Sequence, residues 1–225
     1  MNRPTYLKVT CHLMSPVAGE IPMLDALLLY QMAVFEGKLK PIRRDEPLPP
    51  FGEIHIPILL RRIGGVAVPA CSSPIARVRE TTVEHFGKRL AVEHAGLLKQ
   101  KEQKIVAVTN NIYKSYHLPL KVQRIDKIVW YCIGKRRPIL QALKRVKAIG
   151  RKRSQGYGLV AGWEAEYIDY DYSWYIKSDE GIVLMRPLPV CDELPEDLIG
   201  YQHDYGAVQP PYWHPDRYME RVIPC

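Results

Sequence analysis

Alternating apolar and polar residues at the start of the chain predict a β-strand. In TYLKVTCHL (5–13), the apolar residues from Leu7 to Leu13 alternate with tyrosine and polar residues. This period of two places the apolar side chains on one face of a strand. The segment MLDALLLYQMAVF (23–35) is mostly apolar and predicts a helix that is buried on more than one side.

Short strands separated by glycine and proline are predicted next. EIHIPILLRRIGGVAVPACSSP (53–74) predicts two strands around Gly64 and Gly65, and Pro57 and Pro69 favour edge positions for both of them. Residues 75–104 are charged and weakly patterned, which is compatible with a helix or with a long excursion of the chain. The following IVAVTNNIYKSYHLPLKV (105–122) resembles a strand in composition.

The third region predicts a strand, a helix and another strand. RIDKIVWYCIG (124–134) is typical of a strand. KRRPILQALKRVKAIG (135–150) has a proline near a helix start and a glycine at the expected helix end. YGLVAGWEAEYI (157–168) predicts a further strand. The tail after Asp169 is rich in Pro, Tyr and Asp, and predicts loops draped on the core or on a partner.

The order of these elements indicates the α+β class. A strand, a helix, two strands, an insertion, strands, a helix, a glycine-rich loop and a strand suit a ferredoxin-like sheet of split β-α-β units. We therefore expect one domain over residues 1–168, with residues 75–104 as a large insertion. An acidic, Pro- and Tyr-rich C-terminal extension over residues 169–225 is expected to pack irregularly on this core or on a partner.

Charge is distributed unevenly along the chain, whose net charge is +8. Residues 1–163 carry 28 Lys and Arg against 11 Asp and Glu, whereas residues 164–225 carry 4 against 13. Between Asp126 and Glu164 there is no acidic residue at all. Such charge blocks indicate a polyanionic partner for the basic part, and a solvated basic face is the alternative.

The basic block is densest in AIGRKRSQGYGLV (148–160), which combines three glycines with the run Arg151, Lys152 and Arg153. This segment is not a nucleotide P-loop, because no Gly-Lys-[Ser/Thr] follows. It is not a dinucleotide fingerprint either, since Gly162 comes one position late for G-x-G-x-x-G. Glycine allows a bulky ligand to approach backbone N–H groups closely, so we expect phosphates at this loop.

The remaining composition excludes several classes of protein. The five cysteines are scattered and form no C-x-x-C pair, which indicates reduced thiols, a cytoplasmic location and no zinc site. No apolar run approaches the ~20 residues that span a bilayer, and the first residues lack a secretory signal. We expect no metal, no cofactor and no membrane partner.

Several segments together resemble a known family. The helix that runs into IGRKRSQGYGLVAGWEAE, followed by GIVLMRPLPV, is similar to the RAMP-type subunit of type IV CRISPR effector complexes, the counterpart of the "family five" CRISPR-associated proteins. LDALLLYQMA, IPILLRRIGG with CSSP after it, and HFGKR are also similar to that family. The resemblance covers roughly residues 5–190, and RKRSQGYG is its most specific part.

This resemblance implies a modified RNA-recognition (RAMP) fold that binds the 5′ handle of the CRISPR guide RNA without catalysis. The implied partners are the guide RNA, the backbone RAMP subunit and the large subunit of the complex, with target DNA near the flanking motif as a further candidate. Related subunits carry a thumb-like insertion that wedges between nucleotides, and residues 75–104 are the candidate for it here.

The basic loop supplies the first group of candidate RNA-binding residues. Arg and Lys side chains neutralise phosphates, and Ser and Gln donate hydrogen bonds to phosphate or to a base edge. The tyrosine either stacks on a base or points into the core. The residues are Arg151, Lys152, Arg153, Ser154, Gln155, Gly156, Tyr157 and Gly158.

Three further groups of candidates lie outside the loop. An aromatic and basic cluster suits single-stranded RNA, charged residues of the insertion are expected to touch the guide, and two arginines stand at a helix start, where positive charge opposes the dipole. In each case an ordinary solvated surface is the alternative. The residues are Tyr113, Lys114, Tyr116 and His117, then Arg77, Arg79, Lys88 and Arg89, and finally Arg136 and Arg137.

Two other functions remain open at this point. A metal-independent endoribonuclease that cuts CRISPR repeat RNA needs a base, an acid and a cation, for which His12, Tyr116 or His117, and Lys114 have the right chemistry. A generic RNA-binding protein outside CRISPR biology is the other alternative. Trp130, Trp163 and Trp174 are expected to be core or interface anchors rather than base stackers.

Overall fold

The computed structural model describes residues 5–37, 55–89 and 115–225. Its helices and strands have the following bounds: β1 Thr5–Leu13, β2 Val17–Ala18, α1 Leu24–Phe35, β3 Leu60–Ile63, β4 Val66–Pro69, β5 Ile75–Lys88, β6 Tyr116–Gly134, α2 Arg136–Leu143, a 3-10 turn Arg153–Gln155, β7 Val160–Tyr167, β8 Tyr175–Ser178, β9 Gly181–Leu184, β10 Leu188–Pro189, β11 Leu198–Ile199, β12 Tyr201–Ala207, a 3-10 turn Pro215–Arg217 and β13 Tyr218–Pro224. This content confirms the α+β class. No helix among the described residues is long and apolar enough to cross a membrane.

The main sheet is antiparallel and is built around β1. Strand β1 pairs with β6 on one edge and with β7 on the other, and β5 pairs with the far edge of β6. The short β2 also pairs with β6, at Gln123 and Val122, and so continues the β1 edge. The predicted strand at 5–13, the helix over 23–35 and the two strands around Gly64 and Gly65 are confirmed.

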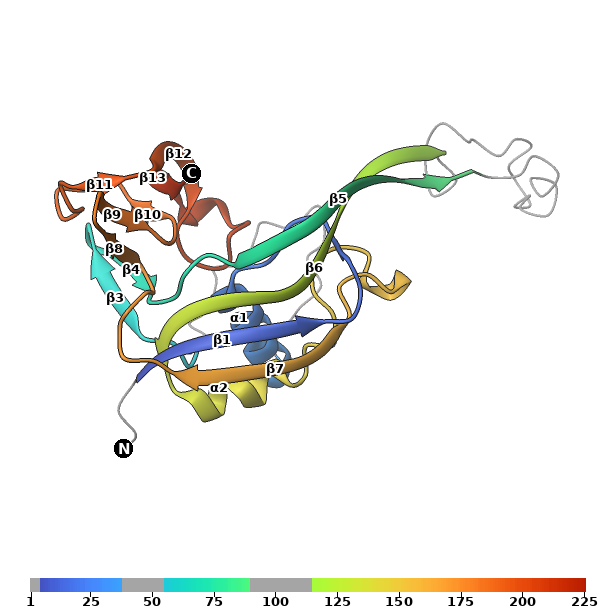
Figure 1. Cartoon of the computed structure of the whole chain (residues 1–225), viewed down its shortest axis with the longest axis horizontal. Helices are drawn as coiled ribbons and strands as arrows, with labels where there is room; N and C mark the ends of the chain where they lie inside the picture. Colours follow the sequence, from blue (N-terminus) through green and yellow to red (C-terminus); the bar gives the residue numbers. More distant parts are fainter. Residues whose placement is uncertain (1–4, 38–54, 90–114) are drawn as a thin grey trace.

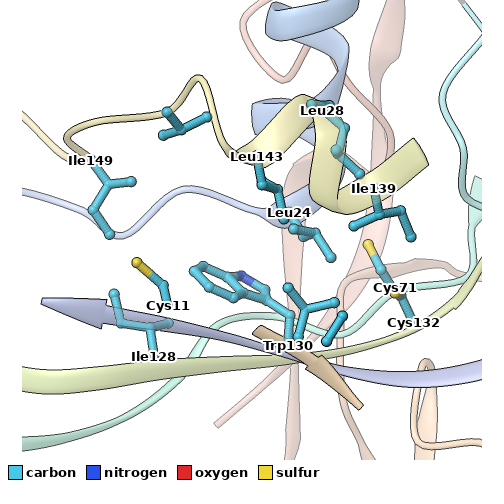
Figure 2. Close-up of a cluster of buried hydrophobic side chains, with 14 of the residues drawn as sticks. Cys11, Leu24, Leu28, Cys71, Ile128, Trp130, Cys132, Ile139, Leu143 and Ile149 are labelled. Atoms are coloured by element: carbon cyan, nitrogen blue, oxygen red, sulfur yellow. The ribbon is translucent and has the colours of Figure 1, made fainter. Parts of the chain in front are cut away.

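The core lies between this sheet and the two helices (Figure 1). Trp130 of β6 is fully buried, and its neighbours Val9 and Cys11 come from the alternating face of β1. Leu24 of α1 and Leu143 of α2 close the cluster from above the sheet (Figure 2). Burial of Trp130 and Trp174, and the packing of Trp163 against this cluster, confirm the expected core role of the three tryptophans.

Strands β5 and β6 form a long hairpin that extends beyond the main sheet, and we call it the arm (Figure 1). Its pairing runs from Ile75 opposite Val129 to Lys88 opposite Tyr116. The helical interpretation of residues 75–88 is therefore wrong, because pairing with the long strand β6 outweighs the weak local pattern. The remainder of the predicted insertion, residues 90–104, lies outside the described residues.

Helix α2 is shorter than predicted. It ends at Leu143 rather than near Gly150. After Lys144 the helical bonding pattern is lost, because Val146 N donates to Leu143 O, three residues back, at 2.9 Å. Beyond this turn, Trp163 Nε1 donates to Val146 O at 3.1 Å, and Ile149 N donates to Gly158 O at 2.9 Å. These contacts bury Val146 and Ile149 in the core and direct the chain into the basic loop.

The prediction of loops after Asp169 is wrong. Strands β8 to β13 form two small sheets, one of which contains the parallel pair β9 and β11. Their buried residues pack with Ile63 and Val68 of the β3–β4 hairpin in a second apolar cluster. Most of these strands have two to four residues, which is too short for an alternating pattern to be recognised in the sequence.

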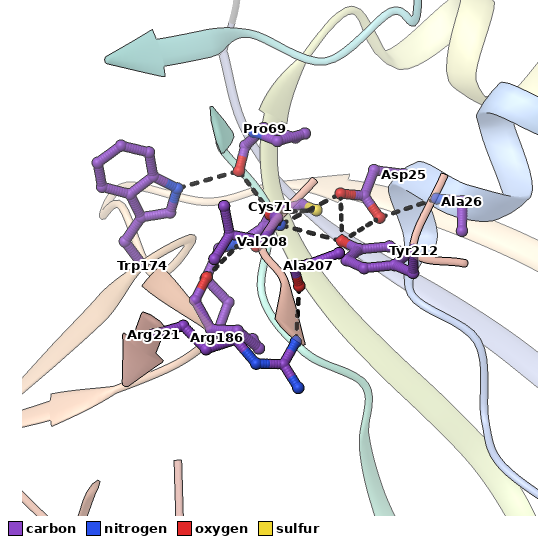
Figure 3. A network of polar contacts seen from close by, with 11 residues as sticks. Asp25, Ala26, Pro69, Cys71, Trp174, Arg186, Ala207, Val208, Tyr212 and Arg221 are labelled. Atoms are coloured by element: carbon purple, nitrogen blue, oxygen red, sulfur yellow. Dashed lines mark hydrogen bonds and ion pairs between the residues drawn. The ribbon is translucent and has the colours of Figure 1, made fainter. Parts of the chain in front are cut away.

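A buried arginine joins this second cluster to the main domain (Figure 3). The guanidinium of Arg186, between β9 and β10, is 0% exposed and forms an ion pair with Asp25 of α1, also 0% exposed, at 3.3 Å. Its Nη1 donates to Pro69 O at 2.5 Å and Cys71 O at 3.0 Å, and its Nη2 donates to Val208 O at 2.7 Å. One side chain therefore bonds to α1, to the end of β4 and to the segment that follows β12.

The Tyr212 hydroxyl completes the network. It donates to Asp25 Oδ2 at 2.8 Å and accepts from Arg186 Nη2 at 3.1 Å. Burial, together with the neighbouring Asp25 charge, raises the pKa of Tyr212 well above its usual value, so the phenol stays protonated and remains a donor. The polar groups at this junction thus satisfy one another away from water.

We predict that Arg186→Met lowers the free energy of unfolding by about 3–5 kcal/mol, because it leaves Asp25 buried without its cation. Chemical denaturation measures this loss. The matched control is Arg61→Met: Arg61 pairs with Asp171 at 2.7 Å, but the two side chains are 36% and 25% exposed. The control should cost about 1 kcal/mol, and equal losses in the two variants would contradict the role of Arg186.

Candidate nucleic-acid interface

The basic loop, residues 150–158, is fixed to the protein at both ends. Arg151 N donates to Ala18 O at 2.7 Å, and Gly158 N donates to Pro16 O at 2.7 Å. Gly158 has φ +64, and a Cβ at this position would lie 2.0 Å from Ile149 O. This glycine is therefore required by close approach of the protein's own backbone. The loop conformation is set before any ligand arrives.

The basic loop is docked on the arm by two of its side chains. The Nζ of Lys152 lies over the ring of Phe86, 3.5 Å from its centroid. The Tyr157 hydroxyl donates a short hydrogen bond to the carboxylate of Glu84, and this bond raises the pKa of the phenol. Two of the predicted RNA-binding side chains are thus engaged in contacts within the protein.

Alternation along β5 explains why these two contacts form on the same side of the arm. Glu84 and Phe86 are two residues apart, so they share one face of the strand. Their partners across the arm, Leu120 and Leu118, lie on that same face. Tyr157 packs against a small apolar cluster to which Leu120 belongs. The loop therefore contacts this face near the outer end of β5, where Phe86 lies two residues before Lys88.

The rest of the basic loop faces solvent. Arg151, Arg153, Ser154, Gln155 and Gly156 are exposed. Among the residues that the structure describes, neither arginine forms an ion pair with a carboxylate. Gly156 has φ +90 with open space where a Cβ would be. This part of the loop presents two uncompensated cations and several hydrogen-bond donors outward.

The bend of the arm carries a second set of cations. Arg77, Arg79 and Lys127 line a surface cavity of about 830 Å³ together with Val78 and Asp126. Register shifts on both sides of Val78 mark β-bulges, which redirect the neighbouring side chains. Arg79 is paired with Asp126, so its charge is largely compensated, whereas Arg77 has no ion-pair partner among the described residues.

The outer part of the arm holds the candidates of the aromatic and basic cluster that the structure describes. His117 stacks on His85, with ring centroids 4.6 Å apart and an interplanar angle of 4°. Tyr116 is 36% exposed and lies opposite Lys88, and Arg89 follows the end of β5 in an exposed position. Tyr113 and Lys114, also predicted as contacts, lie outside the described residues.

Arg136 and Arg137 are separated from these residues. They begin α2, next to the end of β6, where Gly134 pairs with Thr5, whereas the basic loop enters β7 beside Leu13 at the other end of β1. Arg136 Nε donates to Ala165 O at 2.6 Å, and its guanidinium lies 5.6 Å from the Tyr167 ring centroid. The Arg136 side chain is thus engaged in contacts within the protein, whereas Arg137 is exposed.

The residues considered for RNA cleavage do not converge. His12 Nε2 lies 3.2 Å from Glu164 on the sheet. His12 is opposite Lys127 of β6, and His117 lies ten residues before Lys127 on the same strand. At about 3.3 Å per residue, this separation is roughly 30 Å. Among the described residues, no group of three or more His, Cys, Asp or Glu is placed to hold a metal ion.

Two residues of the arm that contact the basic loop are not recognisable as site residues from the sequence. Phe86 and Glu84 hold the basic loop in place, yet neither was a candidate. Glu84 and Phe86 share one face only because residues 75–88 form a strand, and the weak local pattern of this segment does not predict that strand. Their contact with the basic loop has no sequence signal, because Glu84 and Tyr157 are 73 positions apart.

Comparison with known proteins agrees with the expected family. Curated proteins give no match to the chain. The family model described as CRISPR type IV associated protein Csf3 matches residues 72–224, which is more than half of the 225 residues. The match includes the arm, the basic loop and the C-terminal strands. The chain therefore belongs to the CRISPR type IV associated Csf3 family, whose members are Cas5-like, family-five subunits.

Proposed function

We propose that this chain binds and caps the 5′ handle of the guide RNA in a type IV CRISPR complex, as a non-catalytic subunit that also contacts the backbone and large subunits. The observation that carries the proposal is the docking of the basic loop on the arm. Arg151 and Arg153 remain exposed and without carboxylate partners in the part of the chain that the structure describes. Membership in the Csf3 family supports the part of the proposal that assigns this chain to a type IV CRISPR complex.

The order of strands supports a ferredoxin-like sheet as the frame of this subunit. Strands β5, β6, β1 and β7 are neighbours in that order, and α1 and α2 follow β1 and β6 along the chain. This is the strand order that two split β-α-β units produce. In this proposal the arm serves as the thumb, and the loop between α2 and β7 receives the handle.

Charge and backbone geometry favour a phosphate chain as the ligand of the loop. Guanidinium groups form charge-assisted hydrogen bonds with phosphate oxygens, and Ser154 and Gln155 add neutral donors. A loop already held by Ala18 and Pro16 has less conformational entropy to lose on binding. Lys152 and Tyr157 act mainly as positioning residues, because they hold the loop against Phe86 and Glu84.

Arg153→Ala should weaken binding of handle RNA by about 1.5–3 kcal/mol, the scale of hydrogen bonds to a charged group. Fluorescence anisotropy with a labelled repeat-derived 5′ handle measures the change. Arg62→Ala is the matched control, since Arg62 is an exposed arginine on β3 outside the proposed interface. Equal affinities for wild type and Arg153→Ala would show that the loop is not the RNA site.

Gly156→Val should reduce handle binding at least as much without removing charge. Valine disfavours φ +90 and adds bulk on the exposed side of the loop. Gly65→Val is the control, because Gly65 has φ +75 and equally open space in the β3–β4 turn. Both variants need a melting curve. If folded Gly156→Val binds the handle like Gly65→Val, close approach at this glycine is not part of recognition.

Binding should depend strongly on salt, because phosphate neutralisation releases counterions. About five phosphate contacts on a single strand give a slope of log K against log salt near −3.5. Titrations between low and physiological salt measure the slope. A slope near zero would mean that the exposed cations are only solvated surface.

Purified protein should leave labelled repeat RNA intact, because His12 and His117 are too far apart to act on one phosphate. Denaturing gels over several hours provide the measurement. Cleavage at a specific position that disappears in both His12→Ala and His117→Ala would overturn the non-catalytic assignment and favour the endoribonuclease.

A further inference from the structure

The outer strand of the C-terminal extension carries aromatic rings on one face. Tyr201, His203 and Tyr205 alternate along β12 and therefore point to the same side. Tyr218 of β13 lies opposite Ala207 and shares this side. The three tyrosines are 40%, 65% and 43% exposed, respectively. Three exposed tyrosine rings on one face of a strand pair indicate an interaction surface.

A carboxylate lies among these rings. Glu220 pairs directly with Tyr205, so its side chain is on the same face, and it is exposed. The rings of Tyr205 and Tyr218 have centroids 6.2 Å apart and an interplanar angle of 77°. No ion pair of Glu220 occurs within the described ranges. By contrast, Asp204 on the opposite face is paired with Arg221 at 2.5 Å.

The C-terminal extension that carries this face has an excess of acidic residues. Residues 169–225 contain 4 Lys and Arg against 11 Asp and Glu. Of these cations, Arg186 is buried with Asp25, and Arg221 is paired with Asp204. The strands also lie at the far end of the molecule from the arm (Figure 1). The net negative charge of the extension and the exposed Glu220 favour a cationic group over RNA phosphates as the ligand of this face.

We propose that Tyr205, Tyr218 and Glu220 form a docking site for an arginine or lysine side chain on the basic surface of a neighbouring protein subunit. Two ring faces attract a cation through their quadrupoles, and a carboxylate beside them adds a charge-assisted hydrogen bond. Tyrosines in such clusters are frequent hot spots of protein interfaces. The inference rests on the part of the proposed function that joins this chain to other subunits.

Competing occupants are disfavoured by the same charges. A nucleic acid would place phosphates against Glu220 and the acidic extension. A second copy of this chain would have to present its own basic region, which the proposed guide RNA occupies. A basic protein surface satisfies both the rings and the carboxylate, so it is the occupant to which the proposal commits.

The test uses the remaining purified subunits of the same type IV complex, assembled on guide RNA, as the probe. The double variant Tyr205→Ala/Tyr218→Ala should bind this assembly at least tenfold more weakly than wild type, as measured by biolayer interferometry. The charge reversal Glu220→Arg should cause a similar loss. The matched controls Tyr170→Ala and Asp179→Arg alter an exposed tyrosine and an exposed acid away from β12, and they should remain within about twofold of wild type.

Two further measurements on the isolated chain separate this site from RNA binding. The variants should bind the 5′ handle like wild type and should sediment with an unchanged oligomeric state. Unchanged affinity for the assembly, loss of handle binding, or altered self-association in the variants would each overturn the proposal. If the wild-type chain binds no handle RNA but the variants still bind the assembly at least tenfold more weakly than wild type, the docking site is supported and the RNA proposal is wrong.

Discussion

The ion pair between Arg186 and Asp25 is the contact on which the arrangement of this protein depends. Both side chains are fully buried, so neither charge can be hydrated if the other moves away. The same guanidinium donates hydrogen bonds to the carbonyls of Pro69 and Cys71, at the end of β4, and to that of Val208, just after β12. Helix α1, the end of β4 and the C-terminal strands are therefore held in one relative position. Apolar contacts are non-directional, whereas this network accepts only one geometry.

That fixed arrangement gives the protein two surfaces of opposite charge. The arm and the basic loop carry cations at one end of the main sheet, whereas the C-terminal extension, residues 169–225, carries 11 Asp and Glu against 4 Lys and Arg. Because the extension packs on β3 and β4 rather than on the basic loop, it does not neutralise the loop. Separate surfaces of this kind suit a subunit that meets nucleic acid on one side and protein on the other.

Contacts inside the basic region divide its residues between two tasks. Lys152 and Tyr157 have the chemistry of RNA-binding residues, yet one lies over Phe86 and the other is bonded to Glu84. Arg151 and Arg153 remain available on the exposed side of the same loop. A loop whose own side chains fix its position can present its free cations in a defined geometry, which reduces the entropy lost when a ligand binds.

The amino-acid sequence by itself determined the α+β class, the first strand and helix, the β3–β4 hairpin, the three core tryptophans and the basic loop, because periodicity and local charge report directly on burial and solvation. Only the tertiary structure decided that residues 75–88 form a strand, that α2 stops at Leu143 and that the extension is built of strands. It also decided which loop residues face solvent. The physical reason is the same in each case: pairing and docking between distant segments, such as Glu84 with Tyr157, outweigh local preference and leave no periodic signal in the sequence.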